Sequence, residues 1–331
     1  MNKNFTRIII FLCLSTFAFV SNAQVTVTGN ANTTPALAAA YASLANAITA
    51  LNSITAISGP VTISLNAGNP QTAPVGGYVI NFTATTTAAR TVTLTGNNNV
   101  ITTNSALVSG ELTDAVFKII GSNFVTIQNF TMQENVLNIT SAAATNDMTE
   151  WGVALLCAST TNGAQNNTIK GNNISLNRTY SNTFGIYSNA RHSSSNVTII
   201  ADASSTLGAN SNNKIYSNVI NNINMGIAFI GSGNAGFMDL GNEIGSDALT
   251  GNSVGNWGGM AASSSFVGNS GSCYGIFINN QKNENLSFNF ITSASLFGTP
   301  VDTRGIFKFY NTLPTGTFVS SITNNSISVD H

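Results

Sequence analysis

Ile169-Lys-Gly-Asn172-Asn-Ile174 is one copy of a motif, Ile-x-x-Asn-x-Ile, that recurs through the second half of this 331-residue chain. The other copies read Ile215-Tyr-Ser-Asn218-Val-Ile220, Leu286-Ser-Phe-Asn289-Phe-Ile291 and Ile322-Thr-Asn-Asn325-Ser-Ile327. A second motif, glycine followed by apolar residues, recurs at Gly152, Gly185, Gly226, Gly275 and Gly305. Motifs that return every few tens of residues are typical of solenoid folds, in which each repeat stacks on the next.

Two all-β architectures compete for short strands separated by turn residues: an antiparallel sandwich and a parallel β-helix. A sandwich predicts alternating polar and apolar residues joined by two-residue hairpins, whereas here a whole motif repeats in phase. The sequence therefore predicts an all-β fold, a parallel β-helix of roughly seven or eight turns with isoleucines stacked inside. The longest interval, between Gly226 and Gly275, is expected to hide a weaker turn around Gly259.

Asn172, Asn218, Asn289 and Asn325 keep a fixed offset from the flanking isoleucines, so we expect them to stack at the bend between two strands. Asparagine suits such a bend because it tolerates left-handed backbone conformations. Its amide can also donate a hydrogen bond to one neighbour and accept one from the other. The run Asn97–Asn99 is interpreted as a simple loop.

The chain begins with a secretory signal over Met1–Ala23, in which Lys3 and Arg7 precede the apolar run Ile8–Val20. This run is too short for a transmembrane helix, which needs about 20 residues. No later segment has the uninterrupted apolar length of a transmembrane span. We therefore expect an extracellular or cell-surface protein.

Residues 24–75 are predicted to form an N-terminal cap that contains an amphipathic helix over Pro35–Asn52, with Thr34 as its capping residue. The parallel β-helix is expected over residues 76–331. Because the chain stops in mid-repeat, this β-helix is expected to be truncated at its C-terminus. The apolar face of the predicted helix consists of Leu37, Tyr41, Leu44, Ile48 and Leu51.

Composition limits the possible partners. Removal of the signal takes two of the 11 basic residues, so nine face 12 acidic ones and the net charge becomes −3. That balance argues against a nucleic-acid partner, which needs a basic face. Two cysteines remain, Cys157 and Cys273, and they lie at different phases of the repeat. We therefore expect two separate thiols rather than a disulfide.

These motifs resemble those of the right-handed parallel β-helix proteins of the pectin-lyase-like fold. More narrowly, the chain is similar to the N-terminal regions of bacterial surface proteins exported by the type IX route. The resemblance covers the signal, the capping helix and residues 76–331, and it implies a right-handed coil. Proteins of that group finish with a C-terminal sorting domain, and nothing here matches one. Further C-terminal domains of the same protein are therefore expected as partners.

The pectin-lyase-like fold includes polysaccharide lyases and glycoside hydrolases, so an enzyme acting in the outer groove of the coil is the alternative function. Lyases of this group need an arginine or lysine near calcium, and hydrolases need grouped carboxylates. The acidic residues of this chain are scattered singly. The catalytic candidates are Asp302, Arg304, Arg191 and Asp202, for which a surface ion pair and a polar loop are the simpler interpretation.

Asp239, Glu243 and Asp247 recur every four residues and are candidate calcium ligands. Gly241 and Gly245 argue against a helix there, and the order of residues differs from that of a dedicated calcium loop. A polar loop is the simpler interpretation, so no cofactor is expected other than a possible calcium ion.

Aromatic residues are the better indication of binding, because exposed rings can stack on sugars. We expect Phe277, Phe288 and Phe290 in the core. The sequence thus favours a non-catalytic secreted or cell-surface module, an adhesin or stalk that contacts extracellular glycans. The aromatic residues near strand ends are Tyr180, Phe184, Tyr187, Trp257, Tyr274, Phe307, Phe309 and Tyr310.

Overall fold

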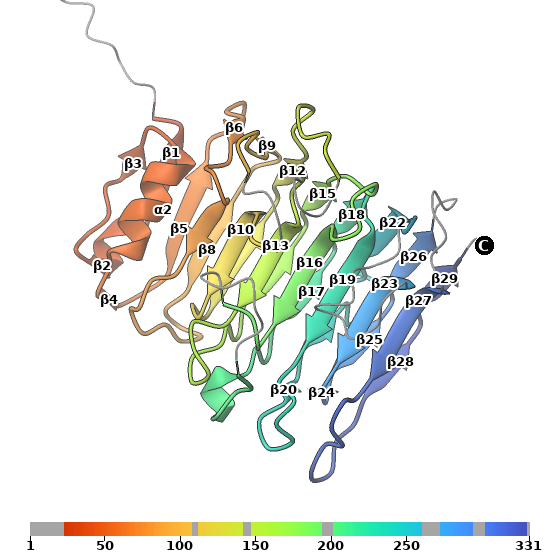
Figure 1. Ribbon diagram of the computed structural model, residues 1–331. Helices are drawn as coiled ribbons and strands as arrows, with labels where there is room; N and C mark the ends of the chain where they lie inside the picture. Colours follow the sequence, from red (N-terminus) through yellow and green to blue (C-terminus); the bar gives the residue numbers. More distant parts are fainter. Residues whose placement is uncertain are drawn as a thin grey trace, which may run out of the picture.

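The computed structural model describes residues 23–107, 112–141, 147–193, 201–259, 272–293 and 302–329. The predicted signal over residues 1–23 lies outside this part, except for Ala23. The protein is an all-β solenoid of stacked parallel strands (Figure 1). Among the described residues, no helix has the length and apolar character needed to cross a membrane.

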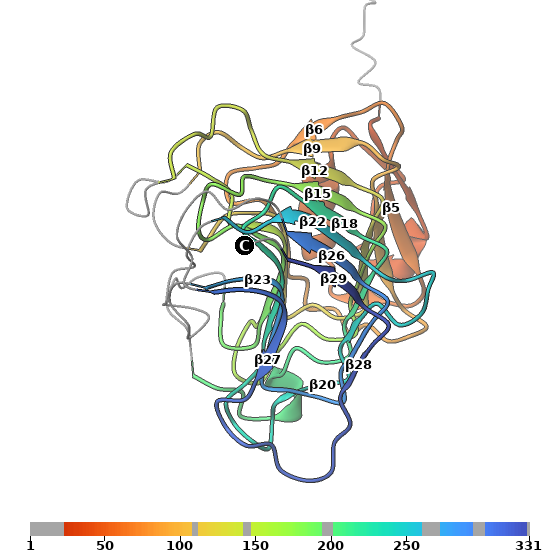
Figure 2. The same ribbon diagram turned by 90° about the vertical axis from the view of Figure 1, so that its right-hand side faces the viewer.

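Each turn of the solenoid contributes one strand to each of three sheets, which surround a common interior (Figure 2). The first sheet runs in the order β3 (Ala40–Tyr41), β1 (Val25–Thr28), β5 (Val61–Leu65), β8 (Val92–Thr95), β11 (Val125–Gln128), β14 (Thr168–Lys170), β17 (Lys214–Tyr216), β21 (Glu243–Ile244), β25 (Asn285–Ser287) and β28 (Ser321–Thr323).

The second sheet runs in the order β6 (Gln71–Thr72), β9 (Val100–Thr102), β12 (Thr131–Gln133), β15 (Asn173–Ser175), β18 (Val219–Asn221), β22 (Ser253–Trp257), β26 (Phe290–Ser293) and β29 (Ser326–Ser328). The third runs in the order β7 (Tyr78–Ile80), β10 (Ala115–Ile120), β13 (Trp151–Leu156), β16 (Phe184–Asn189), β19 (Met225–Ile230), β23 (Ser272–Asn279) and β27 (Asp302–Phe309). Two short pairs, β2 (Thr33–Thr34) with β4 (Ala56–Ile57) and β20 (Asp239–Leu240) with β24 (Gln281–Lys282), complete the strands, and two 3₁₀ turns cover Asn30–Asn32 and Thr206–Gly208.

The two sequence motifs meet inside the solenoid. The last isoleucine of Ile-x-x-Asn-x-Ile lies on the second sheet and packs against a glycine of the third sheet. A Cβ atom added to Gly185 would stand 2.4 Å from Cγ2 of Ile220, and one added to Gly152 would stand 2.5 Å from Cγ2 of Ile174. The glycines therefore stack in a column because the facing isoleucine leaves no room for a side chain.

The turn expected around Gly259 does not exist. Strand β19 pairs directly with β23, with Ile227 opposite Ile276. Gly226 and Gly275 therefore belong to adjacent turns, and the long interval between them is an insertion within one turn. Met260, the other residue of that expected turn, lies outside the described residues.

The asparagine column is confirmed. The backbone N–H of Asn172 donates to Oδ1 of Asn218 at 3.1 Å, and Nδ2 of Asn172 donates to the same oxygen at 3.1 Å and to the Ile127 carbonyl at 3.0 Å. Asn218 repeats this pattern with Oδ1 of Asn252 and the Ile169 carbonyl. Every buried amide is thus satisfied by the turns on either side. The complete column is Asn172, Asn218, Asn252, Asn289 and Asn325.

The structure corrects two details of this column. The left-handed residue at the bend is the one before the stacked asparagine, namely Gly171 (φ 61°), Ser217 (φ 53°) and Phe288 (φ 61°). The asparagines are therefore selected for their amides and not for their backbone conformation. Asn99 is no simple loop residue either, since it is buried at the equivalent position and donates to the Leu65 and Asn66 carbonyls.

The predicted helix over Pro35–Asn52 is wrong in its first half. Helix α2 spans Leu44–Asn52, and Oγ of Ser43 caps it by accepting a hydrogen bond from the Asn46 N–H at 3.2 Å. The preceding residues cannot be helical because Thr33–Thr34 pairs with β4 and Ala40–Tyr41 pairs with β1. Leu44, Ile48 and Leu51 are buried as expected, whereas Leu37 is buried from a loop and Tyr41 lies on a strand.

Two further comparisons with the sequence concern the start of the coil and the cysteines. Parallel stacking begins at β5, which pairs with β8, so the first turn of the solenoid precedes residue 76. Cys157 and Cys273 are both buried and unpaired, as expected.

Candidate functional site

A column of threonines crosses the outer face of the first sheet. Alternation along each strand points Val61 and Ile63 inward and Thr62 outward. The outward threonines stand directly opposite one another on neighbouring strands, so their hydroxyls repeat about every 4.8 Å. This threonine column consists of Thr28, Thr62, Thr93, Thr126 and Thr168, and Lys214 takes the next place.

The column runs into a groove of about 410 Å³. At its edge, each strand is preceded by a left-handed residue, and these are Phe124 (φ 54°), Asn166 (φ 56°) and Asn212 (φ 58°). Because they recur at the same corner of successive turns, one aromatic ring and two amides gather beside the threonine hydroxyls. The lining of this first-sheet groove includes Phe124, Thr126, Asn166, Thr168, Asn212 and Lys214.

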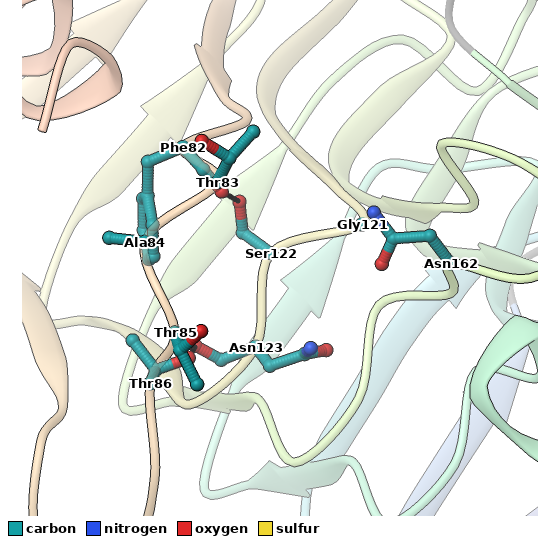
Figure 3. A pocket seen from close by; sticks show the side chains of 9 residues that line it. All are labelled: Phe82, Thr83, Ala84, Thr85, Thr86, Gly121, Ser122, Asn123 and Asn162. Carbon is teal, nitrogen blue, oxygen red and sulfur yellow. Dashed lines mark hydrogen bonds between the residues drawn. The ribbon is translucent and has the colours of Figure 1, made fainter. Parts of the chain in front are cut away.

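Two smaller recesses continue along the same corner of the stack. One, of about 200 Å³, lies beside the segment Phe82–Thr86 (Figure 3). There Ser122 donates to the Phe82 carbonyl at 3.1 Å, and Thr86 donates to the Asn123 carbonyl at 2.8 Å. The other, of about 190 Å³, shares Asn212 with the first-sheet groove and reaches Lys282. The first-sheet groove and the recess beside Phe82–Thr86 are lined mainly by hydroxyl and amide groups, which suit a ligand rich in hydroxyls, whereas the recess that reaches Lys282 is also lined by Leu207, Met238 and Leu240.

The catalytic candidates form two separate ion pairs. Nε of Arg191 lies 3.0 Å from Oδ1 of Asp202, and Arg304 pairs with Asp302 on strand β27. Arg191 follows β16, and β19 and β23 stand between β16 and β27 in the third sheet. The four residues therefore do not meet at one site: Asp302 and Arg304 form the ion pair of the simpler interpretation, whereas Arg191 pairs with Asp202, which the sequence did not predict.

The calcium candidates are not brought together. Asp239 is buried, Glu243 accepts a hydrogen bond from the Tyr216 hydroxyl, and Asp247 accepts one from the Leu249 N–H at 2.8 Å. Within the described ranges, no group of three or more His, Cys, Asp or Glu side chains is arranged to hold a metal ion. Because these residues lie on strands and turns rather than on a helix, their four-residue spacing does not bring their side chains together.

Asp239 is instead buried inside the coil, where its carboxyl accepts hydrogen bonds as a buried asparagine would. Its Oδ1 accepts from the Asn210 N–H at 3.0 Å, and its Oδ2 accepts from Nε2 of Gln281 at 3.1 Å. Burial raises the pKa of Asp239 to about 8, although these hydrogen bonds act in the opposite direction. The nearby Cys157 thiol has a pKa raised by burial to about 11 and stays neutral over the same range.

The stability of the protein is expected to depend on pH through the carboxyl group of Asp239. Its pKa rises from 3.8 in the unfolded chain to about 8 in the folded protein, so the folded state retains the proton between these values. The protonated carboxyl stabilises the folded state fully below pH 3.8, and this stabilisation is lost as the pH rises through 8. The loss in the free energy of unfolding amounts to a few kcal/mol, on the order of 1.4 kcal/mol for each pH unit. Urea unfolding at pH 5 and pH 8 should show this loss in the wild type and a smaller one in Asp239→Asn. Equal pH dependence of both proteins would contradict the assignment.

Most of the aromatic residues near strand ends are buried rather than exposed. Tyr180, Phe184, Tyr187, Trp257 and Tyr274 are fully buried. Several belong to a second apolar layer on the outer face of the third sheet, where Trp151 stacks on Tyr187 with ring centroids 5.0 Å apart.

The remaining aromatic residues divide differently from the prediction. Phe307, Phe309 and Tyr310 are partly exposed on and beside the last strand of the third sheet. Phe277 is in the core as expected, whereas Phe288 is only half-buried and Phe290 is 54 % exposed.

A buried acidic pair was missed. Asp114 and Glu150 immediately precede β10 and β13, and they stand on adjacent turns because the Trp151 N–H donates to the Asp114 carbonyl. Oε2 of Glu150 accepts from the Asp114 N–H at 2.7 Å, and Oε1 accepts from the Tyr180 hydroxyl at 3.3 Å. The turn of Asp114 has Val116 where the next turn has Gly152, so the glycine motif did not mark this repeat and the pair was not found.

Burial and the resulting pKa shifts distinguish this acidic pair from the carboxylates on the surface. Burial and then the charge of Asp114 raise the pKa of Glu150 well above its usual value. Burial lowers the pKa of the neighbouring Lys118, and the two carboxylates oppose that shift. Nζ of Lys118 donates to the Thr113 carbonyl at 2.8 Å. Asp114, Glu150 and Lys118 therefore form a closed, polar cluster beneath the second apolar layer.

Comparison with known proteins adds no functional information. The chain has no significant match to a protein-family model, to a curated protein or to a solved structure. The fold and the geometry of the first-sheet groove therefore carry the functional argument.

Proposed function

We propose that this protein is an exported, non-catalytic, right-handed β-solenoid of the pectin-lyase-like kind that binds an extended extracellular glycan. The threonine column that runs into the first-sheet groove carries this proposal. The expected export signal and the resemblance to surface proteins place the ligand outside the cell.

A repeating ligand suits a repeating surface. One threonine hydroxyl is presented per strand, so a chain lying across the strands would meet an equivalent hydrogen-bonding group at each step. Sugars offer hydroxyls of both donor and acceptor character, which pair with the amides of Asn166 and Asn212. The partly exposed ring of Phe124 provides an apolar surface for a sugar face.

Removal of two hydroxyls tests this proposal. Thr126→Val/Thr168→Val keeps the β-branched shape but is expected to weaken glycan binding roughly tenfold, at about 0.5–1.5 kcal/mol per lost hydrogen bond. Binding can be measured by calorimetry with glycans selected on a soluble-polysaccharide array. Thr131→Val, on the outer face of the second sheet, is the matched control and should bind normally. Unchanged binding by the double variant would exclude the threonine column as the site.

The enzymatic alternative rests on Asp114 and Glu150. The pKa of Glu150 is raised by burial and by the charge of Asp114 on the adjacent turn, and a carboxyl held protonated beside a second carboxylate is the arrangement of an acid–base pair. Both carboxylates are fully buried, so we rank this function second. Assays of the same glycans for new reducing ends and unsaturated uronates would decide: turnover that Glu150→Gln abolishes would establish this function.

A further inference from the structure

The basic side chains that follow the signal fall into two sets. Five are held by other groups of the protein, either in ion pairs or by hydrogen bonds. These are Lys118, Arg178, Arg191, Arg304 and Lys308. The other four, Arg90, Lys170, Lys214 and Lys282, make no ion pair with any residue in the described part of the chain, although Lys282 donates a long hydrogen bond of 3.4 Å to the Ala235 carbonyl.

All four unpaired cations lie on or beside the first sheet. Lys170 ends β14 and Lys214 begins β17, and both point outward and are exposed. Lys282 lines the recess that shares Asn212 with the first-sheet groove, and Arg90 immediately precedes Thr91 of the groove lining. Since five strand steps separate β8 from β25, these cations extend over about 24 Å of the stack.

Local carboxylates do not neutralise this row. Glu243 stands opposite Lys214 on the neighbouring strand and accepts a hydrogen bond from the Tyr216 hydroxyl, but it forms no ion pair with Lys214, and this one carboxylate faces four cations of the described first-sheet region. Asp239 lies on the adjoining β20, where it is fully buried and faces the interior. The first-sheet face is therefore cationic, although the chain as a whole carries more acidic than basic residues.

We propose that the first-sheet groove binds an anionic glycan, whose carboxylate or sulfate groups pair with Lys170, Lys214 and Lys282. This inference rests on the proposed function and specifies its ligand class. The threonine column contacts the sugar hydroxyls, and the lysines contact the acidic substituents. Each exposed ion pair contributes little by itself, but several at fixed spacing on one polymer chain act together.

Binding by the full protein to three probes tests the ligand class. The probes are alginate, which carries carboxylates, dextran sulfate, which carries sulfates, and dextran, which is neutral. We expect binding to one or both acidic probes, with affinity that falls as salt is raised from 50 to 500 mM, because salt screens exposed charges. Lys170→Gln/Lys214→Gln should weaken this binding by about tenfold and reduce its salt dependence.

The matched control is Arg191→Gln/Arg304→Gln, which removes the same charge from two ion pairs of the third-sheet turns and should leave the affinity unchanged. Preference for alginate or for dextran sulfate would identify the acidic group. Equal, salt-independent binding of dextran would overturn the anionic assignment and leave the proposed glycan function intact. Failure to bind any of a broad range of glycans would overturn both.

Discussion

Asn218→Leu is expected to lower the free energy of unfolding by about 4 kcal/mol, because it interrupts the asparagine column between Asn172 and Asn252. The side chain is fully buried, accepts from both the backbone N–H and Nδ2 of Asn172, and donates to the Ile169 carbonyl. Leucine can replace none of these bonds, so the Asn172 N–H and the Ile169 carbonyl lose this partner inside the protein. Urea unfolding followed by circular dichroism measures the effect.

The control for this change lies on β18, the strand that begins directly after Asn218. Asn221 is exposed and points outward from β18, so Asn221→Ala should change the stability by no more than about 0.5 kcal/mol. A loss of less than about 1 kcal/mol for Asn218→Leu would mean that the asparagine column contributes little to stability beyond ordinary packing.

Gly185→Ala is expected to destabilise the protein by about 3 kcal/mol, at the upper end of the usual cost of overpacking. The new methyl would stand 2.4 Å from Cγ2 of Ile220 and 2.7 Å from the Gly226 carbonyl oxygen. The second contact is with backbone of the next turn, which cannot move without shifting the stack. Thermal and urea unfolding of the purified variant would measure this loss.

Two comparisons separate this clash from a general effect of alanine. Gly236→Ala places a methyl at an ordinary 3.5 Å from Asn234 and should be nearly neutral. In a double-mutant cycle, Gly185→Ala and Ile220→Ala together should cost less than the sum of the single changes, because the second removes part of the clash. Simple additivity would show that the glycine column is not shaped by the facing isoleucine.

The sequence predicts those parts of the fold that repeat. Ile169, Asn172 and Gly185 each recur at a fixed place in the turn, and each such place became a column in the structure. The start of helix α2 was not predictable from periodicity, because the segment Pro35–Tyr41 has apolar residues at helical spacing and yet follows β2 and includes β3. Backbone pairing with distant strands decided that segment.

The candidate site was less accessible to sequence analysis. Phe124, Asn166 and Asn212 belong to three turns of unequal length, and only their shared left-handed conformation shows that they occupy one corner. The exposed and the buried aromatic residues could not be separated from the sequence, because alternation distinguishes the inner from the outer face of a strand but not an exposed from a covered outer face. Tyr187 and Tyr274 point outward and are nevertheless buried.

The asparagine column also has a direction. The backbone N–H of each asparagine donates to the amide oxygen of the next asparagine along the chain, while its Nδ2 donates both to that oxygen and to a carbonyl of the preceding turn, so each turn is bonded to the turns on both sides. In the last described turn, Asn325 accepts from Asn289 and donates only to the Leu286 carbonyl. Because each buried amide joins three successive turns, adjacent turns should open together rather than one at a time under pulling or heating.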